Sequence, residues 1–304
     1  MHVFITGASG HLGSAVVPEL LTAGHRVTGL ARSDASADAI AALGADVRRG
    51  DLGDLDTLRE AAVEADGVIH LAFRHDLMQQ GDMATAGAVD LAALAAFADA
   101  LAGTGKPLVG TSGTLMLAGA NLGRAGTEED VLAGGHRVDS ENFVIGLSSR
   151  GVRSSVVRLP PTVHSALDVH GFVPSLIAMA RTRGRAAYVG DGANRWAAGH
   201  TLDAARLYRL AIESAPAGTR LHSVGDEGIA FREIAETIGR RLGVPAVSVV
   251  ADEAADSFGF LASFVGLDAP VTSEVTRSVM GWAPREVGLL ADLELEHYFA
   301  VVAP

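Results

Sequence analysis

The first thirteen residues constrain the fold of this chain more than any other stretch. Four apolar or β-branched residues, Val3 to Thr6, are typical of a short buried strand. Three glycines then follow at G-x-x-G-x-x-G spacing, and Leu12, Val16 and Leu20 begin an apolar stripe at helical spacing. A strand, a glycine-rich turn and a helix in this order predict a phosphate-binding site.

Each glycine has a separate physical purpose in such a turn. Gly7 permits the tight turn, Gly10 lets backbone amides approach a diphosphate, and Gly13 lets the helix pack closely on the strand. The amides at the start of the helix favour the anion. The alternative is a glycine-rich turn without a ligand. The residues expected to bind the cofactor here are Gly7, Ser9, Gly10, His11, Leu12 and Gly13.

The segment TGASGHLG resembles the extended and atypical short-chain dehydrogenase/reductase group, which includes NAD-dependent epimerase/dehydratase-like proteins. The resemblance covers essentially the whole chain. Six predicted strands alternating with helices indicate an α/β fold, a doubly wound parallel (Rossmann) sheet with a smaller C-terminal substrate-binding lobe. We expect the dinucleotide domain to span 1–163, with 197–225 returning to it, and the lobe to comprise 164–196 and 226–304.

The end of the second predicted strand, Arg26 to Ala31, bears on the choice of cofactor. Ala31 stands where relatives that prefer NAD would carry an aspartate for the ribose hydroxyls. Arg32 and Ser33 could hold a 2′-phosphate through a charge-assisted contact and a hydroxyl. The alternatives are a solvated loop arginine and interference from Asp34. We therefore predict NADP as the cofactor, with NAD as the second possibility.

The resemblance implies further cofactor contacts at the ends of later strands. Asp51 and Leu52 would meet the adenine, although Asp51 and Asp54 also suit the start of a helix. After the fourth strand, His75 or Asp76 could contact substrate or could be solvated loop residues. The remaining residues that the resemblance assigns to the cofactor are Leu71, Ala72, Phe73, Thr111, Pro160 and Val163.

The catalytic residues depart from the pattern of the group. Its active members carry Tyr-x-x-x-Lys on one helix, yet no tyrosine occurs between Met1 and Arg185. The family register puts Arg137 at the lysine position and Ala133 at the tyrosine position. Arginine is always charged and cannot relay a proton in the usual way. Ser112 best fits the position that polarises a substrate carbonyl, unless it is only a turn serine.

Later segments supply weaker candidates. His164 has a side chain suited to proton transfer near neutral pH, but a structural imidazole is an equal alternative. Arg195 and Trp196 lie in a G-D-G region that closes the substrate pocket in the relatives. The alternative is a β-hairpin in which Trp196 fills the core.

Composition excludes several classes of partner and site. Lys and Arg total 24 against 36 acidic residues, and no basic block occurs, so we expect neither nucleic acid nor anionic membrane as a partner. The alanine-rich runs look too short to span a bilayer. The chain has no cysteine and no clustered metal ligands, so we expect no metal. The first strand follows Met1 directly, which suggests a cytoplasmic protein without a signal peptide.

These observations favour an NADP-dependent oxidoreductase that reduces a carbonyl or similar small molecule. A non-catalytic dinucleotide-binding sensor or scaffold is the main alternative, because the acid/base couple is missing. A sugar-nucleotide epimerase or dehydratase is a third possibility. The helices near 85–101 and 136–149 pair in homodimers of the relatives, so a homodimer is possible here.

Overall fold

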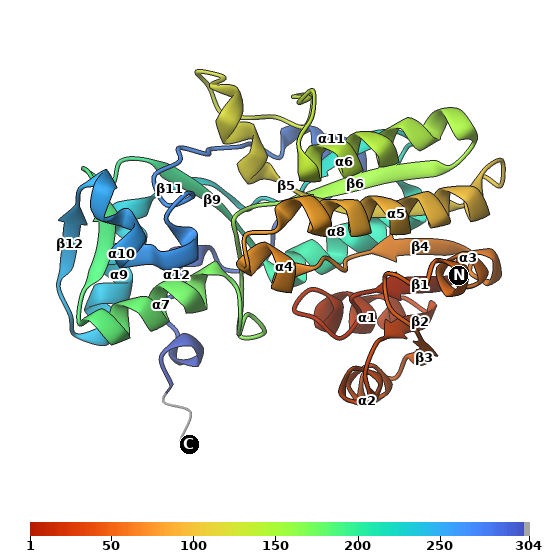
Figure 1. The fold of residues 1–304 in the computed structure, drawn as a ribbon, viewed down its shortest axis with the longest axis horizontal. Helices are drawn as coiled ribbons and strands as arrows, with labels where there is room; N and C mark the ends of the chain where they lie inside the picture. The colour runs from red at the N-terminus through yellow and green to blue at the C-terminus, as the bar shows by residue number, and fades with distance from the viewer. Residues whose placement is uncertain (301–304) are drawn as a thin grey trace.

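The computed structural model describes residues 1–300 and has a seven-stranded parallel sheet at its centre (Figure 1). The strand order is β10-β6-β5-β4-β1-β2-β3. The predicted doubly wound α/β fold is confirmed, and β10 extends the sheet beyond the six predicted strands. The strands of this sheet are β1 (His2–Thr6), β2 (Arg26–Ala31), β3 (Asp46–Arg49), β4 (Gly67–His70), β5 (Pro107–Gly113), β6 (Arg153–Leu159) and β10 (Thr219–His222).

Helices cover both faces of this sheet, which explains why its inner strands are continuous apolar runs. One face packs against helices that bring Leu58, Ala93 and Phe97 to a common core. The opposite face packs against helices that bring Val16, Ile40 and Leu207 into the other core. The first set comprises α3 (Leu55–Glu64), α5 (Met83–Leu101) and α6 (His136–Gly146), and the second comprises α1 (Gly13–Thr22), α2 (Asp34–Ala42) and α8 (Thr201–Ser214).

Helix α5 is longer than the sequence pattern suggested. It begins at Met83, where Asp82 accepts a hydrogen bond of 3.0 Å from the amide of Thr85. By length and composition alone it could cross a membrane, but half of its most apolar window is buried in the fold. Its burial against the sheet is the pattern of a core helix, so we assign it no membrane role.

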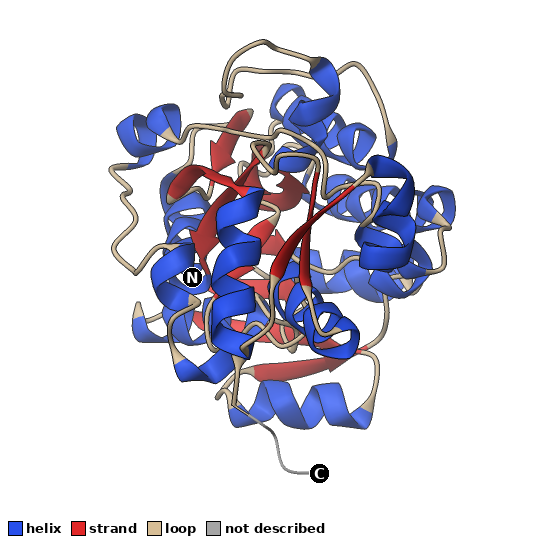
Figure 2. Cartoon of the chain, turned by 90° about the vertical axis from the view of Figure 1, so that its left-hand side faces the viewer, coloured by secondary structure: helices blue, strands red, loops and turns tan. Residues whose placement is uncertain are grey.

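The C-terminal lobe contains two small sheets and most of the remaining helices. Figure 2, which looks at the molecule from the lobe, shows its helices around the strands. The strand β9 pairs with β7 on one side and with β11 on the other, and β12 pairs with β8. These strands are β7 (Thr162–His164), β8 (Ala186–Val189), β9 (Arg195–His200), β11 (Asp226–Ala230) and β12 (Ala246–Val249).

The lobe and the central sheet alternate along the chain. After β9 the chain returns to the sheet through α8 and β10, and it then re-enters the lobe. The amphipathic helix α9 buries Phe231, Ile234 and Ile238. The remaining helices are α4 (His75–Gln79), α7 (Phe172–Arg183), α9 (Phe231–Leu242), α10 (Ala254–Phe258), α11 (Glu274–Met280) and α12 (Leu289–Asp292).

Candidate dinucleotide and substrate site

The glycine loop between β1 and α1 is built for close backbone contact. Gly7 has a φ of +74°, which side chains other than glycine rarely adopt. A Cβ at Gly13 would lie 2.3 Å from the carbonyl oxygen of Gly7, so only glycine allows α1 to start there. Ser9 and Gly10 are exposed, and Leu12 caps the helix with its backbone alone. This open cradle at the start of a helix fits a diphosphate.

The segment after β4 lies against this loop. A Cβ at Gly7 would lie 2.8 Å from the amide nitrogen of Ala72. Leu71 donates its amide to the carbonyl of Thr6 at 3.2 Å, and Ala72 donates to the Thr6 hydroxyl at 3.3 Å. The fold thus brings Leu71 and Ala72 beside the glycine loop, at the edge where dinucleotides bind in such sheets.

The end of β2 presents two arginines rather than one. Arg32 is exposed just beyond the strand, and Arg49 lies opposite Ala31 in the neighbouring β3. Arg49 donates to the Ser33 carbonyl at 2.6 Å and pairs with the carboxylate of Asp34. Arg49 was missed by the sequence reasoning, although its place at the end of a predicted strand could have suggested it. The Arg49–Asp34 pair leaves Asp34 partly neutralised beside Arg32.

The hydroxyl of Ser33 has a structural task. It accepts a hydrogen bond of 3.2 Å from the amide of Ser36 and caps α2, and the Ser36 hydroxyl lies 3.1 Å away. A 2′-phosphate at Ser33 would therefore meet a hydroxyl that is already engaged.

The predicted adenine contacts lie on the loop before α3. Asp54, and not Asp51, caps this helix, through bonds from the amide and hydroxyl of Thr57. These bonds hold the pKa of Asp54 below its usual value. Asp51 instead accepts the amide of Gly53 at 2.7 Å and stays exposed, while Leu52 packs at the rim of the core. Asp51 is therefore free of the helix-capping task.

A buried polar chain runs beneath the ends of β1, β4 and β5. His70 contacts the Thr6 hydroxyl at 2.7 Å through Nδ1 and the Asp90 carboxylate at 3.0 Å through Nε2. Burial alone would raise the pKa of Asp90, but the bond and charge of His70 and the charge of Arg137 lower it overall. The hydroxyl of Thr111 donates to the His70 carbonyl at 2.7 Å and contacts Tyr208 at 2.8 Å. Thr111 thus stabilises the sheet edge through its side chain.

Arg137, near the start of α6, is the last member of this polar chain. Its Nη2 donates to the Thr111 carbonyl at 3.0 Å, and its Nη1 lies 3.7 Å from Asp90. Its guanidinium carbon lies 4.2 Å from the centre of the Phe73 ring. Desolvation lowers the pKa of Arg137, and the charge of Asp90 opposes that effect. The side chain is held rigidly at the ends of β4 and β5.

His75 lies beside this arginine, on the first turn of α4. Its ring packs edge-on against Phe73, with 5.4 Å between ring centres. Desolvation and then the charge of Arg137 lower the pKa of His75, while the carboxylate of Asp76 opposes them. Asp76 itself is held by Arg74, and that bond lowers its pKa to about 2. The structure thus offers a neutral imidazole close to Arg137, with the Phe73 ring in contact with both side chains.

Ser112 does not lie at an open strand end. The strand β5 continues to Gly113, and Ser112 is buried opposite Arg158, whose guanidinium pairs with Glu141 of α6. Its hydroxyl has Met116 Sδ as a neighbour at 4.0 Å. Thr114, just beyond the strand, is also buried, and its hydroxyl has no hydrogen-bond partner within residues 1–300. Thr114 was not named as a candidate from the sequence, although it follows Ser112 by only two residues.

His164 is buried in β7 and faces the lobe rather than solvent. Its Nδ1 lies 2.9 Å from the Asp292 carboxylate, and its ring packs edge-on against His200. It borders a cavity of about 120 Å³ whose other walls include Asp203, Asp226 and Glu286. His164, the predicted proton donor, is therefore fully buried. Its contact with Asp292 matches the alternative interpretation, a structural histidine. Of its neighbours, Pro160 is buried and Val163 is half-buried.

The expectation that Arg195 and Trp196 form pocket walls needs correction. Trp196 is completely buried in the lobe core, where its ring packs edge-on against Phe231 at 4.9 Å. Arg195 is exposed and makes a two-pronged pair with Asp268, at 3.0 and 2.8 Å. Alternation along β9 sends one side chain inward and its neighbour outward. Neither side chain lines the cavity beside His164 or the cavity between α7 and α9 within residues 1–300.

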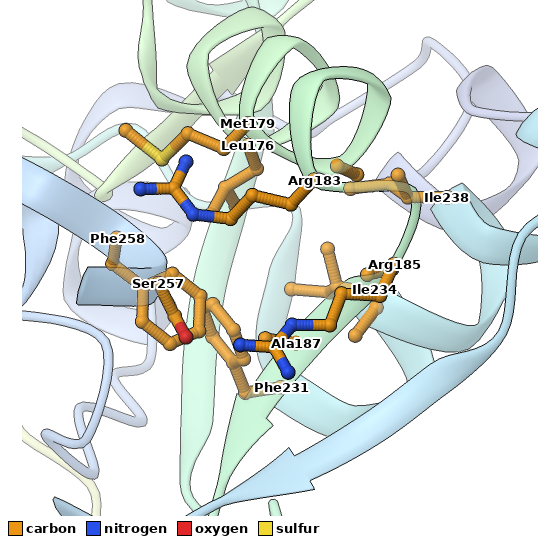
Figure 3. A pocket seen from close by; sticks show the side chains of 13 residues that line it. Leu176, Met179, Arg183, Arg185, Ala187, Phe231, Ile234, Ile238, Ser257 and Phe258 are labelled. Atoms are coloured by element: carbon orange, nitrogen blue, oxygen red, sulfur yellow. The ribbon is translucent and has the colours of Figure 1, made fainter. Parts of the chain in front are cut away.

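Figure 3 shows a second, smaller cavity within the lobe. Leu176 and Met179 of α7, Ile234 of α9 and Phe258 of α10 line its apolar walls. Its volume is about 20 Å³, room for roughly one water molecule. No residue of the glycine loop reaches it, so it is a packing gap of the lobe rather than part of the dinucleotide site.

Comparison with known proteins places this geometry in a family. The model of the NAD dependent epimerase/dehydratase family matches residues 3–120, which run from β1 past the end of β5. Uncharacterized proteins of Schizosaccharomyces pombe and Saccharomyces cerevisiae are each 43% identical to the chain, over 98% of its length and 99–100% of theirs. The chain belongs to the NAD-dependent epimerase/dehydratase family.

The fold agrees with this family assignment. The structure of a UDP-glucose 4-epimerase from Thermotoga maritima superposes with a TM-score of 0.77 over 98% of each chain, at 17% identity. In this member of the NAD-dependent epimerase/dehydratase family, the glycine loop follows the expected pattern. The helix α6 differs, because it carries Arg137 and no tyrosine.

Proposed function

We propose that this protein is an NADP-dependent oxidoreductase that reduces a carbonyl or similar small molecule. The observation that carries the proposal is the open glycine cradle combined with Arg32 just beyond β2, a strand that ends in Ala31 where an NAD-preferring relative would carry an aspartate. An arginine there favours a 2′-phosphate, and an aspartate would favour free ribose hydroxyls. Arg49, anchored on the Ser33 carbonyl, adds positive charge to the same corner.

The side chains near the ends of β4 and β5 would then have separate roles in the reduction. A bound NADPH supplies the hydride. Arg137 would hold the cofactor and would favour negative charge that develops nearby. The hydroxyl of Thr114 would donate a hydrogen bond to the substrate carbonyl. Thr114 and Ser112 are both buried, and Thr114 is preferred because its hydroxyl has no hydrogen-bond partner within residues 1–300. His75 is the neutral imidazole placed to supply the proton.

A second function has one specific observation in its favour. The helix α6 lacks the tyrosine of the usual acid/base couple, and its Arg137 is fixed by Phe73, Thr111 and Asp90. A sensor or scaffold that binds the dinucleotide without turnover would need no such couple. Transient oxidation of a sugar hydroxyl normally requires that base, so we rank epimerase or dehydratase activity last.

Transfer of deuterium from cofactor to product separates these functions. The full chain would be incubated with NADPH deuterated at C4 of the nicotinamide and a panel of aldehydes, ketones and enones. Deuterium in a reduced product, from one face of the cofactor only, supports the reductase. Saturable NADPH binding without transfer to any member of the panel would favour the sensor.

A further inference from the structure

The side chain of His11 joins the glycine loop to the C-terminal lobe. Its Nε2 lies 2.8 Å from the hydroxyl of Thr201, at the start of α8. That hydroxyl also accepts a bond of 2.8 Å from Ser165 and donates one of 3.1 Å to the carbonyl of His164. Because the single hydroxyl proton of Thr201 goes to His164, Nε2 of His11 must carry the proton of their shared bond.

This proton assignment leaves Nδ1, on the other side of the ring, without a proton. The space between Nδ1 of His11 and the Asp168 carboxylate is called the gap below. When His11 is neutral, its Nδ1 has only a lone pair, and it faces the Asp168 carboxylate at 3.8 Å. Asp168 is buried and is held by the amide of Gly171 at 2.8 Å and the hydroxyl of Tyr298 at 3.4 Å. A lone pair and a carboxylate that face each other repel, and one proton between them would turn repulsion into a bond.

The neighbouring charges decide when that proton binds. Desolvation, and then the charges of His164 and His200, lower the pKa of His11 to about 4. Desolvation raises the pKa of Asp168 to about 6, against its bonds to Gly171 and Tyr298 and the charge of His164. A further carboxylate, that of Asp292, is paired with His164 at 2.9 Å. At neutral pH without a ligand both side chains are therefore mainly unprotonated at the facing atoms.

A diphosphate bound at the glycine loop would change this balance. His11 directly precedes the helix start that favours the anion, and its side chain is partly exposed. Two negative charges close to the ring favour a cation at Nδ1 and also disfavour a bare Asp168 carboxylate. Both effects draw a proton into the gap.

We propose that His11 and Asp168 form a proton-linked latch, in which a bound diphosphate draws one proton between the two side chains and so ties the glycine loop to the lobe. The inference rests on the proposed dinucleotide binding. In this latch His11 is a positioning residue. It holds the loop against Thr201 and Asp168 and takes no part in hydride transfer.

The latch is tested by counting protons as a dinucleotide binds. NADH is titrated into the full chain at pH 7 by calorimetry in buffers of different ionisation enthalpy, because it lacks the 2′-phosphate that titrates nearby. We expect net proton uptake approaching one per site, and a Kd that rises with pH by up to about tenfold per unit. His11→Gln keeps a donor for Thr201, and Asp168→Asn keeps an acceptor for Gly171, yet each should abolish the uptake.

The control is His25→Gln. His25 directly precedes β2, away from the glycine loop, and its imidazole pairs with Glu213. This variant should bind NADH with the same proton uptake as the wild type. Binding without uptake, or equal uptake in Asp168→Asn, would overturn the latch while leaving the proposed function intact. If neither NADH nor NADPH bound, the proposed function would fail and the latch with it.

Discussion

The guanidinium carbon of Arg137 lies 4.2 Å from the centre of the Phe73 ring. One residue comes from α6 and the other follows β4, so the contact joins two segments that lie far apart in the sequence. The Thr111 carbonyl and the buried Asp90 fix the same side chain from below. Arg137 therefore combines a structural task with a place beside the proposed cofactor.

Replacing Arg137 with methionine should reduce both stability and cofactor binding. The buried Asp90 would lose a positive neighbour, and we expect the free energy of unfolding to fall by about 1–3 kcal/mol. Denaturant unfolding would measure this loss, and NADPH titration should show at least about tenfold weaker binding. Unchanged stability would contradict the role assigned to the Asp90–Arg137 pair.

Gly13→Ala should damage the glycine cradle. The added Cβ would lie 2.3 and 2.4 Å from the carbonyl oxygens of Gly7 and Ala8, so α1 must shift away from β1. We expect a loss of about 1–3 kcal/mol and the loss of NADPH binding. Gly146→Ala is the matched control, because a Cβ there meets nothing within 4 Å. Its stability should stay equal or rise slightly.

Thr114→Ala should lower kcat in any reduction that the protein is shown to catalyse. The hydroxyl of Thr114 has no partner within residues 1–300, whereas Ser112 lies under α6 against Met116. We expect at least a tenfold loss for Thr114→Ala and a smaller one for Ser112→Ala, from steady-state kinetics. A larger effect at Ser112 would restore the assignment made from sequence.

Asp168→Asn should stabilise the protein at neutral pH. Burial raises the pKa of Asp168 to about 6, so the folded state favours its protonated form. The ionised carboxylate costs stability above pH 6, and this cost fades as the pH falls toward the usual pKa of a carboxyl group. In denaturant unfolding at pH 7.5, the free energy of unfolding of the variant should exceed that of the wild type by up to about 3 kcal/mol. Below the ordinary pKa of 3.8 the difference should approach zero, and a variant less stable at pH 7.5 would refute this cause.

The parts predicted from sequence are those specified by neighbouring residues. The strand, glycine turn and helix of the first thirteen residues follow one another directly, and so their geometry follows from local pattern. The burial of Ser112 could not be predicted from local pattern, because it depends on β5 running to Gly113 and on the contact with Met116. Trp196 could equally fill a core or a pocket, since both are apolar surroundings.

Other features depend on contacts between distant segments. His11 and Asp168 meet only after the lobe has folded onto the glycine loop, and no local pattern encodes their 3.8 Å separation. Arg49 lies opposite Ala31, and so close to the Arg32 segment, only because of the register between β2 and β3. Such pairs require the three-dimensional fold before their chemistry can be considered.

The most direct test of the account is to titrate the full chain with NADPH and with NADH, and to repeat both titrations with Arg32→Ala. We expect NADPH to bind at least about tenfold more tightly than NADH, because Arg32 contributes a charge-assisted contact to the 2′-phosphate. Arg32→Ala should remove that preference and leave NADH binding unchanged. Absence of NADPH binding, or equal or tighter binding of NADH to the wild type, would contradict the account.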